Sequence, residues 1–535
     1  MNTFKHPERQ HSMARTAPVG MAMRAAPAMP SWPQRPSFCP PCVAAQDDAC
    51  VALAQECVSD VCTPHAHPLA DAARNAELAE YERTVRARFD AIVPALKEIA
   101  AQQHETGFEQ RAQQIARERL GFELPEIVLN DAWVTTLDMK AMYGHSVLQT
   151  HHALAREFTP REFSARWNGH AEAEAMQRFF IECGFHELDI SPCADGRLKG
   201  LLQFVLRLPH QAVRRRKSYA GAMFDVELNV KQWMETELRR FREGVPTLAD
   251  ANTRYLKIAV YHFSSADPRH EGCAAHGSDD RKAAQAALDR LSAFRTAIEN
   301  GFCCGASVAT LLIGVDTDND AIRIHVPNAQ GEMSVDCAID NLGLYHQTAG
   351  LPASAARALL GSAVDEATRQ QGRSGPDAGM RALIERLLLN NLSQIDYVCA
   401  QHQGRYADIG HAERFINIGD GFEEVHLRNL AYFGHLHTIE EGAADMDVGI
   451  KIFSTLNVAH GLPIPIAIHY RYDEQVPGSR DRAAARCRRV KTAIESRYPV
   501  LAKQGLLFCG MTIQAKQPGT PQETVDDLST NSHGH

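Results

Sequence analysis

An internal repeat constrains the fold of this chain more than any other feature of its sequence. Four short segments recur later in the chain in the same order, and one pair shares the letters TAIE. Ordered matches of this kind indicate an ancient duplication, which predicts two lobes of one fold packed as a pseudo-symmetric pair. The matched segments are HELDISPC (186–193) with RFINIGDG (414–421), KIAVYHF (257–263) with PIAIHYR (465–471), LSAFRTAIE (291–299) with CRRVKTAIE (487–495), and LLIG (311–314) with LLFCG (506–510).

The first copy of the repeat alternates short β-like runs with helical stretches. This alternation predicts a mixed α/β domain, in the α+β class. The β-like runs are 186–190, 203–208, 256–263, 309–315 and 322–326, and the helical stretches are 281–299 and 376–393.

Ahead of the repeat, the pattern is helical. Apolar residues recur at helical spacing from Leu78 to Ile99, and Pro94 should kink or split that helix. A second helix is predicted over 106–119. The division predicted for the whole chain is a disordered Pro- and Cys-rich tail over 1–68, a helical domain over 69–165, a first α/β lobe over 166–404 and a degenerate second copy of that lobe over 405–535.

The tail has the composition of a disordered segment. It holds eight prolines by position 41 and shows no lasting periodicity. Residues 1–46 carry five basic residues and one acidic residue, a local charge of +4. Because no second CxxC follows the first, its cysteines are interpreted as loose thiols of unassigned role. They are Cys39, Cys42, Cys50, Cys57 and Cys62.

Charge and hydropathy exclude several classes of protein. Lys and Arg number 56 and Asp and Glu number 65, and the net charge of −9 argues against a nucleic-acid binder. No run approaches the roughly 20 apolar residues that span a membrane, and the N-terminus lacks the apolar stretch of a secretory signal. We therefore expect a protein kept inside the cell, where clustered cysteines are more often metal ligands or redox groups than disulfides.

The stretch SPCADGRLKG (191–200) places a thiol, a carboxylate and a guanidinium at two-residue intervals. Cys193, Asp195 and Arg197 therefore share one side of an extended segment. The second copy has other residues at these positions. Reactive side chains in only one copy indicate an active site in the first lobe and a supporting role for the second. The aligned second copy has Gly421 for Cys193, Glu423 for Asp195, Val425 for Arg197 and Tyr470 for His262.

Two more residues complete a candidate metal site. His262 lies at the carboxyl end of a predicted buried strand, Cys193 follows another strand, and Cys273 comes eleven residues after the His. Ligand sites in open α/β sheets gather at the carboxyl ends of strands. Two thiolates and one imidazole, with an open fourth position, predict one catalytic zinc ion per chain. Zinc would lower the pKa of a bound water to about 7, Asp195 would orient the hydroxide, and Arg197 would keep Asp195 ionised and off the metal.

Other interpretations of these residues stay open. A fourth protein ligand would make the zinc structural and the chain a non-catalytic scaffold whose tail recruits partners. A redox or hydrolytic enzyme that uses the Cys193 thiol is another option, although no His lies close to it in the sequence. Cys193 as a buried structural thiol and Asp195–Arg197 as an ordinary loop ion pair are the purely structural alternatives.

The motif CADGR (193–197) resembles the C-x-D-x-R signature of β-class carbonic anhydrases. The chain as a whole resembles their divergent branch, the carboxysome shell carbonic anhydrases, also called the epsilon class. The eleven-residue gap between His262 and Cys273 fits that branch, because ordinary β-class enzymes place the second Cys three residues after the His. The resemblance implies a helical N-terminal domain, a zinc-bearing domain and a C-terminal lobe that has lost its zinc site.

The resemblance also implies a reaction and a place in the cell. The reaction is the interconversion of CO2 and bicarbonate, and the place is the inner side of the carboxysome shell in a bacterium, where the enzyme supplies CO2 to Rubisco. It implies a homodimer, with the tail as a tether to Rubisco or to shell proteins. His270, His276 and His411 are candidates for the proton shuttle, and the sequence does not choose among them. Regulation by small molecules or by oxidation is equally open.

Overall fold

The computed structural model describes most of the chain after residue 65. Nearly all of the predicted tail, including its five cysteines, lies outside the described residues, as do Gly421, Glu423 and Val425. Among the described helices, none combines the length and the apolar character that a membrane span needs. The described ranges are 66–130, 137–157, 170–215, 218–245, 252–302, 306–370, 374–420, 426–434, 439–517 and 520–525.

The first described part of the chain is helical, as predicted. The predicted apolar stripe is split near Pro94 into two helices, since α2 ends at Asp90 and α3 begins at Ile92. Pro94 lies in the first turn of α3, where the N–H that proline lacks would have no partner within the helix. The predicted second helix is confirmed as α4. The helices are α2 (Ala72–Asp90), α3 (Ile92–Ala101), α4 (Phe108–Arg119), α5 (Glu126–Asn130) and α6 (Met139–Glu157).

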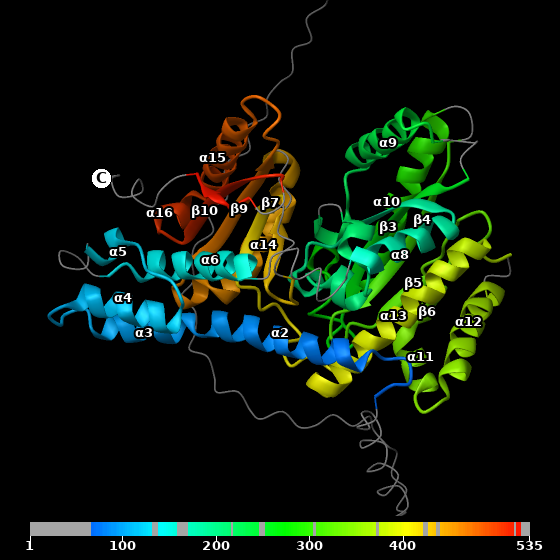
Figure 1. The fold of residues 1–535 in the computed structure, drawn as a ribbon, viewed down its shortest axis with the longest axis horizontal. Helices are drawn as coiled ribbons and strands as arrows, with labels where there is room; N and C mark the ends of the chain where they lie inside the picture. Colours follow the sequence, from blue (N-terminus) through cyan, green and yellow to red (C-terminus); the bar gives the residue numbers. More distant parts are fainter. Residues whose placement is uncertain are drawn as a thin grey trace, which may run out of the picture. The chain divides into compact units, whose positions relative to one another are not determined.

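The first sheet has the strand order β2-β1-β3-β4-β5-β6, of which β3 to β6 are labelled in Figure 1. Its first four strands run parallel, and β5 and β6 are antiparallel to their neighbours. The central strands β3 and β4 are almost entirely buried, which explains why they read as continuous apolar runs. The strands are β1 (Phe185–Pro192), β2 (Arg214–Arg215), β3 (Arg254–Phe263), β4 (Val308–Asp316), β5 (Ile322–His325) and β6 (Ala338–Asp340).

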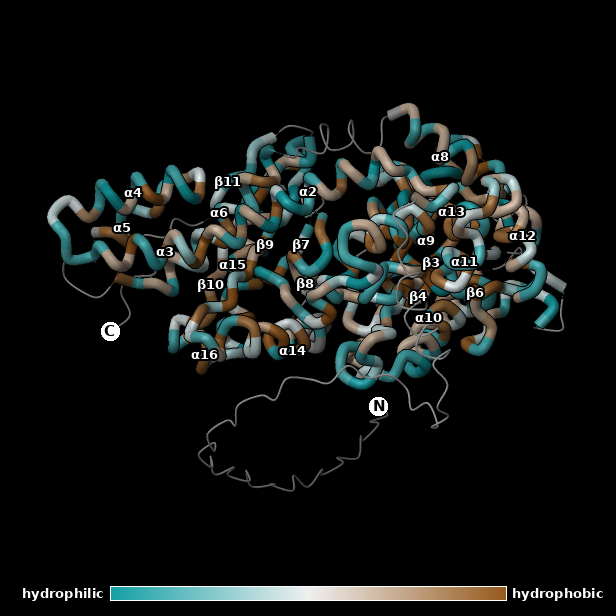
Figure 2. The backbone as a smooth tube through the Cα atoms, turned by 90° about the horizontal axis from the view of Figure 1, so that it is seen from below, coloured by the Kyte–Doolittle hydropathy of each residue, from teal (hydrophilic) through white to brown (hydrophobic). Residues whose placement is uncertain are grey.

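Helices surround this sheet and close its core. Helix α10 packs against β3 and β4, and α8 packs against β1. The hydropathy colouring shows apolar and polar positions mixed along these helices, as expected for elements with one buried face (Figure 2). The helices are α8 (His170–Glu182), α9 (Val226–Arg242), α10 (Asp280–Gly301), α11 (Asn341–Thr348), α12 (Ala353–Gln370) and α13 (Ala378–His402).

One predicted strand is wrong. The run 203–208 is not a strand. Its first residues belong to a wide helical turn over Leu201–Val205, and the N–H of Leu206 donates to the carbonyl of Leu201 at 2.8 Å. The segment is buried on all sides. An unbroken apolar run of this length does not distinguish a buried strand from a buried helical turn, which explains the error.

The second sheet repeats the first in its topology. Its order is β11-β10-β9-β7-β8, with β8, β7, β9 and β10 parallel and β11 antiparallel to β10. The strands β8-β7-β9-β10-β11 of this sheet correspond in turn to β2-β1-β3-β4-β5 of the first sheet. The two sheets agree in the order of the strands along the chain, in their order across the sheet and in their directions, which supports the predicted duplication. Its elements are β7 (Phe415–Gly419), β8 (Ala431–Gly434), α14 (Ile439–Leu456), β9 (Ile464–Tyr472), α15 (Ser479–Arg497), α16 (Pro499–Lys503), β10 (Leu507–Ala515) and β11 (Glu523–Thr524).

The pairing of β7 with β9 shifts the predicted alignment of the two copies. In the first sheet Ile190 pairs with Ile258. In the second sheet Ile466, which the repeat aligns with Ile258, pairs with Ile416 rather than with Ile418. The shift is two residues, so every side chain stays on its predicted face of the sheet.

The shifted register places Gly419, rather than Gly421, at the position equivalent to Cys193. Gly419 has a φ of +106°, and a Cβ there would lie 2.0 Å from the carbonyl oxygen of His469. A side chain cannot occupy this backbone without moving it. The second lobe therefore lacks the backbone conformation of Cys193 as well as its sulfur.

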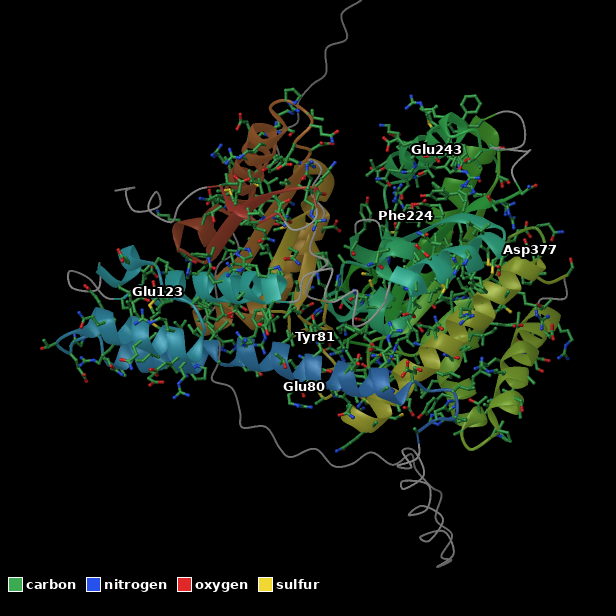
Figure 3. The ribbon with its side chains drawn as sticks, viewed as in Figure 1. Glu80, Tyr81, Glu123, Phe224, Glu243 and Asp377 are labelled. Atoms are coloured by element: carbon green, nitrogen blue, oxygen red, sulfur yellow. The ribbon has the colours of Figure 1, made fainter. Side chains whose placement is uncertain are left out.

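Helix α2 connects the helical part to both sheets. Its Phe89 stacks near Phe415 of β7, with ring centroids 6.1 Å apart. Tyr81 is 5% exposed, and the centroid of its ring lies 6.1 Å from that of Phe204 in the wide helical turn. The neighbouring Glu80 is exposed (Figure 3). The α2 helix therefore ties the two lobes together through its buried face.

Three buried histidines predict a loss of stability in mild acid. His151, His325 and His469 are at most 2% exposed. Burial lowers their pKa values from 6.5, to about 4 for His325 and about 3 for His469. Between pH 6.5 and 4 the unfolded chain binds protons at these rings and the folded chain does not, so the free energy of unfolding falls as the pH falls. We expect a decrease of at least roughly 1 kcal/mol per pH unit in urea unfolding followed by circular dichroism.

A matched pair of variants separates this effect from other acid-labile groups. The His325→Gln variant loses one of the buried rings, so its unfolding free energy should fall less steeply with pH, by up to about 1.4 kcal/mol per unit. The ring of His270 is 75% exposed, so His270→Gln should keep the wild-type slope. An unaltered slope in His325→Gln would contradict the prediction.

Candidate metal centre

Cys193, His262 and Cys273 come together at one edge of the first sheet. Their ligand atoms lie within 4.8 Å of one another, and the three residues are 4%, 1% and 2% exposed. Cys193 directly follows β1, and His262 is the penultimate residue of the adjacent parallel strand β3. The carboxyl ends of parallel strands meet at the same sheet edge, so the strand pairing itself brings the first two residues together.

Hydrogen bonds hold the first ligand loop against the sheet. The N–H of Cys193 donates to the Val260 carbonyl at 2.9 Å, and the N–H of Ala194 donates to the Tyr219 carbonyl at 3.0 Å. The backbone of the loop therefore continues the strand pairing beyond β1. This fixes the direction in which the Cys193 side chain leaves the chain.

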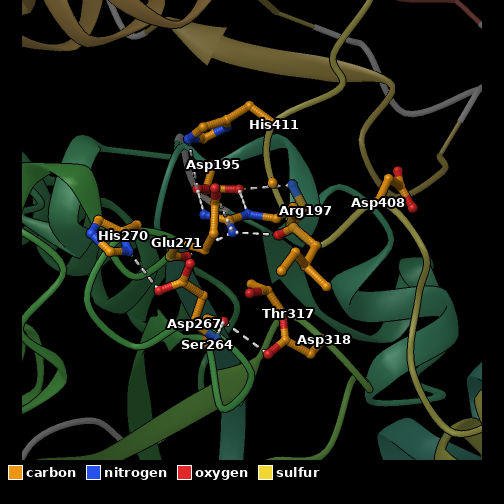
Figure 4. A network of polar contacts seen from close by, with 12 residues as sticks. Asp195, Arg197, Ser264, Asp267, His270, Glu271, Thr317, Asp318, Asp408 and His411 are labelled. Carbon is orange, nitrogen blue, oxygen red and sulfur yellow. Dashed lines mark hydrogen bonds and ion pairs between the residues drawn. The ribbon is translucent and has the colours of Figure 1, made fainter. Parts of the chain in front are cut away.

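The longer loop between His262 and Cys273 is anchored by Asp318, which follows β4. Its Oδ2 accepts from the Ser264 hydroxyl at 2.8 Å and from the Ala266 N–H at 2.6 Å (Figure 4). At the far end of the loop, the Cys273 carbonyl accepts from the N–H groups of His276 and Ser278, both at 3.0 Å. These bonds return the chain to the sheet edge, so the eleven-residue spacing still delivers the second sulfur to the site.

Asp195 and Arg197 form a buried bidentate ion pair beside Cys193, His262 and Cys273. The predicted extended segment is wrong beyond Asp195, because Gly196–Leu198 forms a short 3-10 turn that Asp195 caps by accepting from the N–H of Arg197 at 2.9 Å. Nε of Arg197 lies 2.9 Å from Oδ1 of Asp195, and a terminal guanidinium nitrogen lies 2.8 Å from Oδ2. Another guanidinium nitrogen donates to the carbonyls of Glu271 at 2.7 Å and Ile409 at 2.9 Å. Burial alone would raise the pKa of Asp195, but Arg197 and His262 outweigh burial and hold it well below its usual range.

His262 has one ring nitrogen without a partner. Its Nε2 lies 3.1 Å from Oδ2 of Asp195, whereas its buried Nδ1 has no hydrogen-bond partner among the described residues. Buried polar atoms in native proteins are nearly always satisfied, so a buried ring nitrogen next to two thiols fits the role of a metal ligand.

The two thiols differ in their tendency to ionise. A hydrogen bond between them, together with burial, raises the pKa of Cys193, and the same hydrogen bond lowers the pKa of Cys273. Both are free thiols rather than a disulfide. Two sulfurs and one imidazole form a donor set that suits zinc rather than magnesium or calcium. No fourth His, Cys, Asp or Glu of the described chain joins this group. The residues therefore fit a zinc ion with one position left for solvent.

A small pocket, with room for about one water molecule, lies in front of Cys193, His262 and Cys273. The three ligands and Asp195 line one side of it. The other side comes from the second lobe, and its lining residues there are Tyr432 of β8 and Val448 and Ile452 of α14, with His411 from the connection between the lobes. The second lobe therefore supplies an apolar wall to the pocket of the first lobe.

Backbone hydrogen bonds join the two lobes at the motif itself. Phe433 donates to the Ala194 carbonyl at 3.2 Å, and Asn429 donates to the Gly196 carbonyl at 2.9 Å. The N–H of Gly196 donates to Oε1 of Glu413 at 3.2 Å, and a Cβ at Gly196 would lie 2.4 Å from Cγ of Glu413. Only glycine permits this approach, because Glu413 is itself buried and cannot move aside.

The three candidate proton shuttles lie in different surroundings. His270 is exposed and pairs with Asp267 at 2.8 Å, away from the pocket (Figure 4). His276 is placed 3.2 Å from the Gly221 carbonyl. His411 lines the pocket, with its Nε2 4.0 Å from Oδ2 of Asp195. Sequence reasoning named His411 but missed Glu413 and the apolar wall. The spacing H-x-E at 411–413 was the only available signal.

Comparisons with known proteins agree with this geometry. The models of one family cover nearly the whole described chain: "Carboxysome Shell Carbonic Anhydrase, N-terminal" matches residues 67–159, the catalytic domain matches 175–411 and the C-terminal part matches 412–529. The last two meet at the connection that carries His411 and Glu413.

Curated relatives extend over most of the chain. A protein of Halothiobacillus neapolitanus is 50% identical over 465 residues, which is 86% of this chain and 90% of the relative. One of Prochlorococcus marinus is 50% identical over 459 residues (86% and 88%), and one of Hydrogenovibrio crunogenus is 46% identical over 469 residues (86% and 87%). Each is named "Carboxysome shell carbonic anhydrase". The chain therefore belongs to the carboxysome shell carbonic anhydrase family, which confirms the family predicted from its sequence.

Proposed function

We propose that this chain interconverts CO2 and bicarbonate with one zinc ion per chain, held by Cys193, His262 and Cys273. Carbonic anhydrase activity and a place in the bacterial carboxysome follow from the family. The observation that carries the zinc assignment is the convergence of these three buried donors without a fourth among the described residues. When bound, zinc supplies a nucleophilic oxygen at neutral pH by lowering the pKa of water to about 7.

The residues of the chain orient that oxygen. Each oxygen of Asp195 accepts one hydrogen bond from Arg197. A carboxylate oxygen has a second lone pair, which can accept a hydrogen bond from the reactive water. Arg197 keeps Asp195 ionised and prevents it from turning toward the metal. In this role Asp195 aims the attacking lone pair, and Arg197 fixes Asp195.

The apolar wall of the second lobe suits the substrate. CO2 carries no net charge and no hydrogen, so it gains little from donors and is placed by contact with apolar side chains. Val448 and Ile452 face the ligands across the pocket, and Tyr432 keeps its hydroxyl occupied by donating to the Asp445 carbonyl at 2.9 Å. The wall therefore positions CO2 opposite the zinc ligands, and bicarbonate, being charged, leaves it.

Metal analysis with a stopped-flow CO2 hydration assay tests this function. The expected result is one zinc per chain and hydration far above the uncatalysed rate. One zinc per chain without hydration activity, in reduced and in oxidised samples alike, would leave the scaffold interpretation. Activity without zinc would overturn the ligand assignment.

The assembly of the protein is part of the same proposal. We expect the chain to deliver CO2 to Rubisco at the inner side of the carboxysome shell, as a homodimer tethered through residues 1–68 to Rubisco or to shell proteins. The basic, proline-rich composition of that tail suits coupled folding and binding to an acidic partner. Deletion of residues 1–68 should abolish partner binding and spare CO2 hydration, and binding that survives the deletion would refute the tether.

A further inference from the structure

A buried acidic turn, Asp316–Asp320, contacts the loop that runs from His262 to Cys273. The turn has the sequence DTDND, begins at the last residue of β4, and none of its five residues is more than 6% exposed. Its carboxylates do not form a second metal site, because the two groups of side chains in the described chain that could share an ion do not include them. The oxygens of the turn bond to other parts of the protein instead.

The carboxylate of Asp318 orders the start of the ligand loop. Its Oδ2 accepts from the Ser264 hydroxyl at 2.8 Å and from the Ala266 N–H at 2.6 Å (Figure 4). The Ser264 hydroxyl in turn accepts from the N–H of Asp267 at 3.0 Å. One carboxylate oxygen therefore fixes the first residues after β3, which begin two positions beyond His262.

A second turn carries this order on to Cys273. The N–H of Glu271 donates to the Asp267 carbonyl at 2.9 Å, and the Glu271 carbonyl accepts from Arg197 at 2.7 Å. Cys273 follows two residues later. Each contact depends on the one before it, so the position of the second sulfur depends on the turn that Asp318 starts.

The acidic turn is itself fixed by the rest of the molecule. The N–H of Tyr406, in the connection between the lobes, donates to the Asp318 carbonyl at 2.8 Å. Arg428 of the second lobe donates to the Thr317 carbonyl at 3.0 and 3.2 Å. The Thr317 N–H and hydroxyl both donate to the Phe263 carbonyl, at 2.9 and 3.0 Å. Asp318 is therefore a rigid support for the ligand loop.

The freedom of this loop bears directly on metal affinity. Ten residues separate His262 from Cys273. Bringing the ends of a flexible segment together costs conformational entropy, and that cost lowers the affinity for any ion that needs both ends. A loop that the fold has already ordered presents both ligands to the ion without this cost.

We propose that Asp318 is a positioning residue for Cys273 and sets the zinc affinity of the site by ordering the ligand loop. This proposal rests on the zinc assignment in the function proposed above. Asp318 contacts neither the three proposed ligands nor the lining of the pocket, so its effect passes through Ser264 and Ala266.

Competition for zinc with a chromogenic chelator tests the proposal without turnover. Asp318→Ala removes the acceptor of both loop hydrogen bonds and should weaken zinc binding about 10–100-fold, the loss expected when a residue that orients a ligand is removed. Asp318→Asn keeps one acceptor oxygen, so its zinc affinity should lie between those of Asp318→Ala and the wild type. Wild-type affinity in Asp318→Ala would overturn the positioning role.

Asp320 provides the matched control from the same turn. It is 3% exposed, but its Oδ2 accepts from Gln394 and Tyr406 rather than from the ligand loop. Asp320→Ala should therefore bind zinc as tightly as the wild type. An equal loss of affinity in Asp320→Ala and Asp318→Ala would contradict a specific role for Asp318.

A double-mutant cycle with Ser264 tests the route of the effect. Ser264→Ala leaves the carboxylate in place and should weaken zinc binding roughly two- to tenfold, the value of one hydrogen bond. In the Asp318→Ala background the same change should have almost no further effect, because its partner is gone. Additive losses would refute the route through Ser264. Urea unfolding of each sample shows whether it is folded, and a lower unfolding free energy with unchanged zinc affinity would make Asp318 merely structural.

The two proposals fail in different ways. If the wild type binds one zinc per chain and shows no hydration activity, the proposed function is wrong, and the zinc affinities still decide the role of Asp318. If the wild type is active and both Asp318→Ala and Ser264→Ala bind zinc as tightly as it does, only the positioning role is wrong.

Discussion

Replacement of Cys193 by serine should remove zinc from the purified protein and reduce CO2 hydration to the uncatalysed rate. A serine hydroxyl stays protonated at neutral pH and is a poor zinc ligand, whereas a thiolate is a strong one. Loss of a contact that merely orients a ligand weakens metal binding by about 10–100-fold, so loss of a ligand itself should cost more than about 100-fold. Zinc content by elemental analysis and stopped-flow hydration on the same sample measure both effects.

A second buried thiol provides the control for this variant. Cys337 is 7% exposed, and its Sγ donates to the Ala367 carbonyl at 3.1 Å, a contact that a serine hydroxyl can keep. Cys337→Ser should therefore retain zinc and activity. If Cys193→Ser kept a full equivalent of zinc, another residue would have to be the ligand.

Replacement of Arg197 by methionine should destabilise the fold and abolish activity together. The guanidinium is fully buried and donates to Asp195 and to the carbonyls of Glu271 and Ile409. Methionine fills similar volume but leaves the buried Asp195 charge without its partner. Breaking a buried ion pair in this way costs about 3–5 kcal/mol. Urea unfolding should show a loss of this size, and hydration should fall because Asp195 no longer orients the reactive water.

Arg281 offers the matched exposed pair. It binds both oxygens of Asp336, but both side chains are about two-thirds exposed. Arg281→Met should therefore leave the unfolding midpoint and the hydration rate close to wild type. A stable, fully active Arg197→Met variant would show that the pair beside the zinc ligands has no part in folding or in catalysis.

The second lobe contributes directly to the candidate metal centre of the first lobe. It closes the pocket with Tyr432, Val448 and Ile452, and its β8 strand bonds the backbone of the ligand loop directly. The apolar side chain of Ala194, next to the first ligand, belongs to the hydrophobic core of that lobe. A deletion of the second lobe would therefore expose the metal loop and open the pocket to water.

Much of this protein could be predicted from residue order alone. The repeat predicted two α/β lobes, and their sheets share strand order and direction. The positions of Cys193 and His262 at strand ends pointed to one sheet edge, where the structure places them. The predicted extended backbone from Cys193 to Arg197 is wrong, because Arg197 lies in a short helical turn. The inference from strand ends succeeded because the carboxyl ends of neighbouring parallel strands meet at one edge of the sheet.

Other features depended on packing between segments far apart in the chain. The turn at Leu201–Val205 is buried on every side, so its apolar pattern carried no period that distinguishes a strand from a helix. The pairing of β7 with β9 moved the equivalent of Cys193 to Gly419, because register is set by contacts across the sheet. The placement of His411 in the pocket and the apolar wall opposite Cys193 and Cys273 arise only where the lobes meet. Such contacts join surfaces more than a hundred residues apart, and no local pattern encodes which surfaces will touch.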